Sequence, residues 1–203
     1  MKRFFCLLLA AVFILSACAA DEGLRLKDLL AEPKGGVYSS PFGITIDLNG
    51  LSVLTAGELA EMSALEGSDT EDALTREMDK GNAVAILSAT AETDSLTMTL
   101  IPTDKLPQDA RTADLYADYT AEQMPGKLEA LQCTNVQVNR TYVILGETEY
   151  PAVYVSCNFV DGSPYYLLQF CFGEGGWMGG LSVTSLESPI AIQELLNHVT
   201  TSE

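Results

Sequence analysis

The sequence is poor in positive charge, in histidine and in tryptophan. Its 203 residues include 11 Lys and Arg against 28 Asp and Glu, one His and one Trp, and the formal net charge is −17. The protein is not expected to bind nucleic acid, because it has no surplus of basic side chains to neutralise phosphates. A single histidine excludes multi-histidine metal centres. We therefore expect no nucleic-acid partner, no bound metal and no cofactor.

The sequence also lacks an apolar run long enough to span a bilayer. Its main apolar run, residues 4–15, follows the basic pair Lys2 and Arg3. Twelve helical residues cover about 18 Å, whereas the hydrocarbon core of a bilayer is about 30 Å thick. A basic head followed by a short apolar core is typical of a signal peptide that is removed from the mature protein. We predict that residues 1–17 form this signal peptide.

The apolar run ends in Leu15-Ser16-Ala17-Cys18, which resembles a bacterial lipobox. The resemblance implies that the Cys18 thiol is diacylated and that cleavage before it makes Cys18 the new N-terminus. Two acyl chains anchor a protein stably, whereas one alone is marginal. An ordinary secretory signal, cleaved after Ala17 or Ala20, is the alternative. We expect a protein that is lipid-anchored in the cell membrane at its extracytoplasmic face.

The charge of the mature chain bears on how it meets the membrane. Removal of residues 1–17 takes away Lys2 and Arg3 and no acidic residue, which leaves 9 basic and 28 acidic residues and a formal charge of −19. An anionic lipid surface repels such a body. The lipid on Cys18 is therefore the expected membrane contact.

Three cysteines follow the lipobox, namely Cys133, Cys157 and Cys171. In an extracytoplasmic protein, one disulfide and one free thiol would be an ordinary outcome, but the sequence does not fix the pairing. A hairpin with Val160 opposite Tyr165 would place Cys157 and Cys171 on opposite faces of a sheet, because side chains alternate. We therefore favour buried free thiols that pack as small apolar residues.

The remaining chain predicts a lipidated cysteine and tether at 18–36, followed by a single domain at 37–200. In the tether, an apolar run from Leu24 to Leu30 predicts one or two helical turns or a plain spacer. In the domain, apolar periodicity and capping residues define the expected elements. The expected strands are 38–48, 83–91, 95–101, 135–145, 150–160, 165–172 and 177–184, and the expected helices begin at Thr55, Ser68, Thr112 and Ser188.

This order predicts an α+β fold with a single, mostly antiparallel sheet flanked by helices. The helix from Thr112 is expected to end near Met124, before Pro125 and Gly126, with a further turn to Leu131 as an alternative. The last helix is expected to carry an apolar stripe. That stripe comprises Ile192, Leu195, Leu196 and Val199.

Three loose motifs in the domain resemble the PsbP-like family. They are an opening of Tyr38, Phe42, Gly43, Ile44 and Ile46, a helix start of Thr112, Ala113 and Tyr116, and a corner of Leu145, Gly146, Tyr150 and Pro151. The resemblance covers residues 37–200 and implies an α/β/α sandwich, which is found in a photosystem accessory subunit, in a nuclear Ran-binding protein and in small bacterial lipoproteins. It implies a non-catalytic binding or accessory module. No functional residue of those members matches here, so none is carried over.

The candidate chemistry is sparse, and we expect no catalytic residue. His198 is the only imidazole, and a dyad with Cys157 or Cys171 has no flanking signature. The acidic residues within 66–79 lack the spacing of an EF-hand and fit a solvated helix face. Trp177, close to two glycines, is the one candidate contact residue, with core packing as its alternative.

Together these features favour a lipid-anchored extracytoplasmic lipoprotein that acts as a non-catalytic binding or accessory module at the cell envelope. Its partner would be an envelope protein or a ligand that the sequence does not identify. Two alternatives remain open. A small envelope hydrolase would bring His198 to a cysteine or would hold carboxyls of raised pKa in a cleft. A small-ligand carrier would contain an apolar pocket with a few convergent polar groups.

Overall fold

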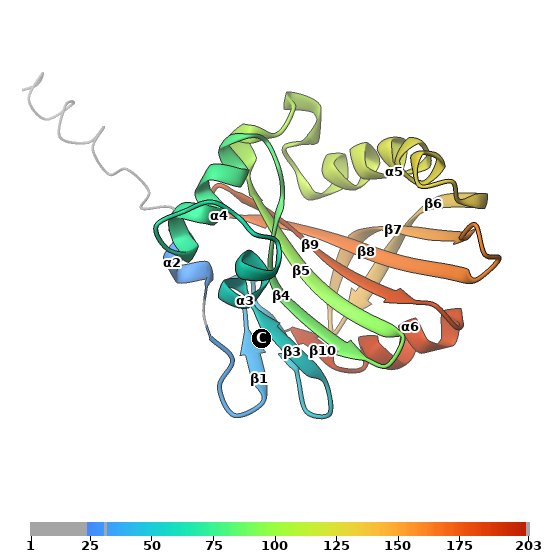
Figure 1. Ribbon diagram of the computed structural model, residues 1–203, viewed down its shortest axis with the longest axis horizontal. Helices are drawn as coiled ribbons and strands as arrows, with labels where there is room; N and C mark the ends of the chain where they lie inside the picture. Colours follow the sequence, from blue (N-terminus) through green and yellow to red (C-terminus); the bar gives the residue numbers. More distant parts are fainter. Residues whose placement is uncertain (1–23, 31, 202–203) are drawn as a thin grey trace, which may run out of the picture.

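The fold is built on a seven-stranded antiparallel sheet with the strand order β3-β4-β5-β9-β8-β7-β6 (Figure 1). The computed structural model describes residues 24–30 and 32–201, so the predicted signal peptide, lipobox and Cys18 lie outside the described residues. The strands of this sheet are β3 (Ser52–Thr55), β4 (Val84–Ala91), β5 (Asp94–Pro102), β6 (Thr134–Leu145), β7 (Thr148–Asn158), β8 (Pro164–Glu174) and β9 (Trp177–Ser185).

The sequence patterns for β4 to β9 are confirmed as one hairpin and one four-strand meander. Strand β9 then pairs with β5, so that Leu96 lies opposite Val183. This pairing joins the hairpin to the meander and puts both in one sheet. The expected large antiparallel sheet is therefore present.

A second sheet, β1-β2-β10, corrects the expectation of a single sheet. It consists of β1 (Val37–Ser39), β2 (Ile44–Asp47) and β10 (Val199–Thr201). The predicted strand 38–48 is divided because the Ser40 hydroxyl accepts hydrogen bonds from the amides of Phe42 and Ile44, at 3.2 and 3.3 Å. These bonds hold the chain in a turn between β1 and β2.

The third strand of this small sheet also corrects the expected last helix. Helix α6 (Pro189–Leu196) is capped by Ser188, whose hydroxyl accepts from the amide of Ala191 at 3.4 Å, as predicted. The helix ends before Val199, which lies in β10 opposite Ile46. A partner about 150 residues away is not visible in a local apolar pattern, and for that reason Val199 was expected in the helix.

The other helices follow their predicted starts closely. They are α2 (Leu26–Leu29), α3 (Ala56–Met62), α4 (Thr70–Asp79) and α5 (Ala113–Ala130), with short 3-10 turns η1 (Thr103–Lys105) and η2 (Gln108–Ala110). Helix α3 has the predicted capping pair, in which Glu58 accepts from the amide of Thr55 at 2.8 Å. Helix α4 begins one residue later than expected, because Asp69 is its cap and accepts from the amide of Asp72.

Helix α5 is longer than the sequence suggested. It passes through Pro125 and Gly126 without a break and ends at Ala130, so the expected end near Met124 is wrong and the alternative of a further turn is confirmed. Ala117 and Leu128 are buried, whereas Leu115 is 40% exposed.

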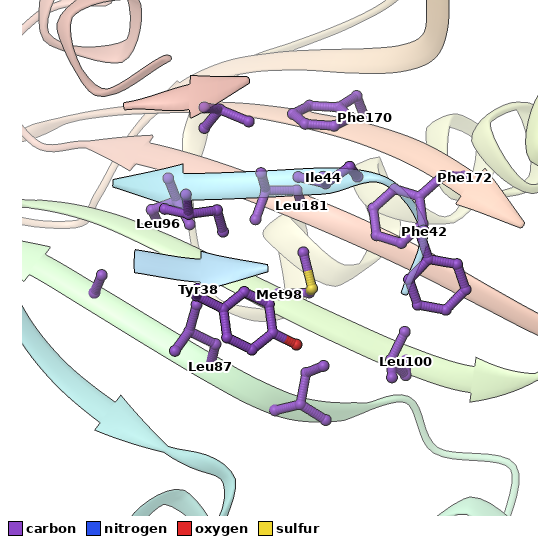
Figure 2. Packing of buried hydrophobic residues seen from close by; sticks show 14 of the residues in the cluster. Tyr38, Phe42, Ile44, Leu87, Leu96, Met98, Leu100, Phe170, Phe172 and Leu181 are labelled. Carbon is purple, nitrogen blue, oxygen red and sulfur yellow. The ribbon is translucent and has the colours of Figure 1, made fainter. Parts of the chain in front are cut away.

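The two faces of the large sheet carry separate apolar clusters. One face packs against α6, α2 and the small sheet and contains the main cluster, in which the rings of Phe42 and Phe172 lie 5.0 Å apart (Figure 2). The opposite face packs against α5 and contains Val153, Val155 and Leu167. Figure 1 shows α5 and α6 on opposite sides of the sheet. The sheet is therefore covered on both faces.

In the described part of the predicted tether, helix α2 forms one helical turn that packs against the domain. Leu26 and Leu29 are buried in the main cluster. The Tyr38 hydroxyl donates to the carbonyl of Leu29 at 3.4 Å, and Lys34 forms a β-bridge with Val37. From Leu24 onward, this part of the chain is thus attached to the fold.

Candidate functional site

Trp177, the predicted contact residue, makes its polar contact within the chain. It lies at the start of β9, partly buried against the main cluster. Its indole Nε1 donates a hydrogen bond of 2.5 Å to the carbonyl of Leu24. A Cβ built on Gly175 would lie 3.0 Å from Cγ of Leu24, so the β8–β9 turn also contacts this residue closely. The indole therefore fastens the N-terminal segment to the sheet.

The glycines beyond Trp177 accommodate side chains of neighbouring strands. A Cβ on Gly179 would lie 2.0 Å from the ring of Phe172, its direct partner in β8. A Cβ on Gly180 would lie 2.7 Å from the side-chain nitrogen Nε2 of Gln169. The sequence indicated a close approach by a backbone or a ligand at these glycines. Side chains from the same sheet fill that space.

The β7–β8 register corrects the expected positions of two cysteines. Asn158 lies opposite Pro164, which shifts the predicted register by three positions. The turn runs from Phe159 to Ser163, where the amide of Phe159 donates to the carbonyl of Ser163 at 2.9 Å. An odd shift reverses which residues share a face.

Cys157 and Cys171 lie on the same face, the one beneath α5, and not on opposite faces. Cys157 lies opposite Tyr165, six positions along β8 from Cys171. Six strand residues span about 20 Å, so these two thiols do not meet. All three described cysteines are buried and unpaired in the structure. Burial raises the pKa of Cys171 to about 12.

His198 lies away from every described cysteine. Its Nδ1 is 2.8 Å from the carbonyl oxygen of Asp47, and its amide donates to the carbonyl of Leu195. It thus sits among α6, β2 and β10, on the face of the sheet opposite the cysteines. The structure does not bring His198 to Cys157 or Cys171 as a hydrolase of that kind requires.

The acidic residues within 66–79 lie along and ahead of α4, and Asp72 among them has a local role. Asp72 accepts from the amide of Ser68 at 2.8 Å and pairs with Arg76 at 3.0 Å. The hydrogen bond from Ser68, then that from Arg76, lowers the pKa of Asp72. Nowhere in residues 24–30 and 32–201 do three or more His, Cys, Asp or Glu side chains gather as a metal ion needs.

A cavity of about 790 Å³ lies where α3, α4, the start of β4 and helix α5 meet. Sequence reasoning missed this site, because its lining comes from segments far apart in the chain. Its apolar wall includes Leu59, Leu65, Leu74, Val84, Ile101 and Leu106. Its volume falls in the usual range for small-molecule sites, about 300–1,000 Å³.

The polar side chains that line this cavity are two lysines, two tyrosines, one carboxylate, one serine and one asparagine. Lys105 pairs with Asp79 at 2.9 Å, and this contact raises the pKa of Lys105. Burial raises the pKa of Tyr116 to about 12, so its hydroxyl stays protonated near neutral pH. Lys127, in the last turn of α5, takes part in none of the ion pairs found in the described part of the chain.

Lys127 is therefore available to a ligand, whereas Lys105 is already paired with Asp79. Glu77 on the cavity wall is already held by Lys80 and Asn82, and the Lys80 contact, followed by that of Asn82, lowers its pKa. An apolar wall beside a free ammonium and a protonated phenol suits a ligand with an apolar body and one acidic group. This arrangement can bind such a molecule.

Comparison with known proteins gives structural likenesses only. No family model matches the chain, and no curated protein matches its sequence. Cyanobacterial PsbP (CyanoP) from Synechocystis has a TM-score of 0.49 and 14% identity, over 85% of this chain and 99% of that chain. LpqN of Mycobacterium tuberculosis, described as involved in cell envelope biogenesis, has a TM-score of 0.38 and 14% identity, over 82% of this chain and 88% of that chain.

A protein from Bacteroides thetaiotaomicron gives a TM-score of 0.37 and 11% identity, over 83% of this chain and 49% of that chain. All of these TM-scores lie below 0.5, so no property of those proteins is assigned to this chain. The fold shown here is a large antiparallel sheet with helices on both faces and a second, small sheet. Among the described residues, no helix has both the length and the apolar character needed to cross a bilayer.

Proposed function

We propose that the protein is a lipoprotein, anchored through Cys18 at the extracytoplasmic face of the cell membrane, and that its PsbP-like domain binds or supports another envelope component without catalysing a reaction. The observation that carries the proposal is the sequence Leu15-Ser16-Ala17-Cys18 directly after a basic head and a short apolar core. This pattern supports export, cleavage and acylation.

The attachment of the N-terminal segment fits an anchored domain. Only five residues, 19–23, separate Cys18 from Leu24, and Leu24 is bonded to Trp177. The six residue steps from Cys18 to Leu24 reach at most about 22 Å when fully extended. In the proposed arrangement, the end of the domain with Trp177 and the β8–β9 turn therefore lies close to the membrane.

The non-catalytic part of the proposal is supported by the geometry of the reactive groups. His198 and the described cysteines lie on opposite faces of the large sheet. The carboxyls of Glu58, Asp72, Glu77 and Asp161 have lowered pKa values because they accept hydrogen bonds. A general acid at neutral pH needs the opposite shift, so these four groups do not fit that role.

The location is tested by protease treatment of intact cells. The full chain, with its leader, is expressed in a bacterium and exposed to proteinase K before and after the envelope is opened. The proposal expects digestion once the protease reaches the extracytoplasmic face, while a cytoplasmic marker stays intact. Digestion of the domain only after the cytoplasmic membrane is broken would contradict it.

A second candidate function, a small-ligand carrier, is favoured by the cavity between α3, α4 and α5. Its apolar wall and the free ammonium of Lys127 fit an amphiphile with one acidic group. Dodecanoate is a suitable probe, with binding measured by calorimetry. We expect Lys127→Gln to weaken binding about tenfold, since a charge-assisted contact contributes about 1.5 kcal/mol.

Lys34→Gln is the matched control for this test. It removes the same charge from an exposed lysine that does not line the cavity, and it should leave binding unchanged. Equal affinity of the Lys127→Gln and Lys34→Gln variants, or no binding by the parent protein, would contradict the carrier function. The anchoring proposal would be unaffected by that result.

A further inference from the structure

Cys133 is held inward by an irregular stretch of backbone between α5 and β6. Its amide donates to the carbonyl of Leu128 at 2.9 Å, and its side chain is buried. Gln132 and Asn135 on either side adopt left-handed φ values of 62° and 54°, which non-glycine residues seldom do. The β6–β7 register is also shifted between Thr134 and Gln137. The fold thus bends around Cys133 and turns its thiol toward the cluster beneath α5.

Cys157 reaches the same place from the neighbouring strand. Thr134 lies opposite Asn158, so Cys133, directly before β6, and Cys157 in β7 flank this pair diagonally. Both are buried in the cluster that packs under α5. Burial and then the neighbouring Cys133 thiol raise the pKa of Cys157 to about 11, which agrees with this placement. Cys171 lies about 20 Å along the sheet from this pair.

We propose that Cys133 and Cys157 form a disulfide when the protein folds in an oxidising compartment, and that Cys171 remains a free thiol. The bond joins the end of α5 to the second strand of the meander. The occurrence of this bond in cells rests on the proposed function, since exported proteins meet oxidants that cytoplasmic proteins do not. The pairing itself rests only on the geometry of the two residues.

The oxidant is a disulfide-bearing thiol compound or thiol oxidoreductase. One cysteine, as its thiolate, attacks a sulfur of that disulfide, forms a mixed disulfide and releases one thiol of the oxidant. The second cysteine then attacks the mixed disulfide, closes the Cys133–Cys157 bond and releases the second thiol. Two protons and two electrons pass from the protein to the oxidant. Because the folded thiols are buried, closure is expected during folding.

The pairing is tested by refolding the whole chain in a buffer of oxidised and reduced glutathione, followed by alkylation and mass mapping without reduction. Trypsin places Cys133 in peptide 128–140, and cleavage before Asp161 separates Cys157 from Cys171. We expect peptide 128–140 to be linked to the peptide with Cys157, with a loss of two hydrogens. The same link should form in Cys171→Ser and be absent from Cys133→Ser.

Alkylation of both Cys133 and Cys157, or a link that contains Cys171, would overturn the proposal. The peptide map of the parent protein is sufficient for this test, even if Cys133→Ser does not fold. Reduction of the bond should lower Tm by about 5 °C or more, since it closes a loop of about 25 residues. The same map on protein isolated from cells tests the location separately. A link that forms in glutathione but not in cells supports the pairing and contradicts the extracytoplasmic location.

Discussion

The indole nitrogen of Trp177 donates a hydrogen bond of 2.5 Å to the main-chain carbonyl of Leu24, a residue 153 positions earlier in the chain. This bond joins the first described residue to the start of β9. Two residues further on, Leu26 enters the main apolar cluster. The single tryptophan of the chain therefore helps to hold the N-terminal segment against the sheet.

Trp177→Phe should loosen this segment while the sheet remains folded. An aromatic ring is kept, but the donor to the Leu24 carbonyl is lost together with part of the ring volume, and loss of the hydrogen bond alone costs about 1 kcal/mol. Arg25 and Lys27 lie within the segment and are exposed, so trypsin should cleave there faster in the variant, as followed by mass spectrometry. Tyr142→Phe, at a 53% exposed tyrosine on β6, is the control. Equal cleavage rates in the two variants would show that the bond does not hold the segment.

Gly179→Ala and Gly126→Ala should change stability in opposite directions. A Cβ at Gly179 would overlap the buried ring of Phe172, whereas a Cβ at Gly126 would meet nothing within 4 Å. Overpacking costs about 1–3 kcal/mol, and alanine in place of glycine inside a helix contributes about 0.5–1 kcal/mol. Urea denaturation measures both free energies of unfolding. A Gly179→Ala variant as stable as the parent would contradict the packing described here.

Stability should fall as the pH rises from about 9 to 12. Burial raises the pKa of Cys171 from 9.0 to about 12, and that of Tyr38 from 10.0 to about 12. Because the folded pKa lies above the unfolded one, the stabilisation is complete below the unfolded pKa and is lost as the pH approaches the folded pKa. Each such group contributes a slope of about 1.4 kcal/mol per pH unit within its window.

The contribution of Cys171 to this slope can be isolated by the Cys171→Ala variant. Its free energy of unfolding is measured at intervals from pH 8 to 11. The decline with pH should be less steep than in the parent, by up to about 1.4 kcal/mol per pH unit, because one titrating group is missing. The variant loses some packing at every pH, so the comparison concerns the slope and not the absolute value. Parallel curves for the two proteins would show that the thiol does not titrate as described.

Local patterns in the sequence predicted most of the large sheet and most helix starts. The Thr55–Glu58 capping pair and the Ser188 cap act between residues three apart, so a short window of sequence contains all that defines them. The small sheet was not predicted, because β10 forms only when Val199 meets Ile46 across the fold. Pro125 indicated a helix end that the surrounding packing of α5 overrides.

The candidate sites depended still more on tertiary contacts. An error of three positions in the β7–β8 turn reversed the relative orientation of Cys157 and Cys171, because side chains alternate along a strand. The cavity draws its lining from helices and strands between Leu59 and Lys127, and no single segment of sequence contains it. Trp177 was identified because it is a lone tryptophan near glycines, but its partner Leu24 could not be identified in this way.

The central claim, that the protein is anchored by a lipid on Cys18, is tested by metabolic labelling with an alkyne fatty acid, followed by detergent phase partitioning. The parent chain and Cys6→Ser, which alters only the proposed signal peptide, should carry the label and enter the detergent phase. Cys18→Ser should carry no label. An unlabelled parent protein in the aqueous phase, or equal labelling of the Cys18→Ser variant, would contradict the account.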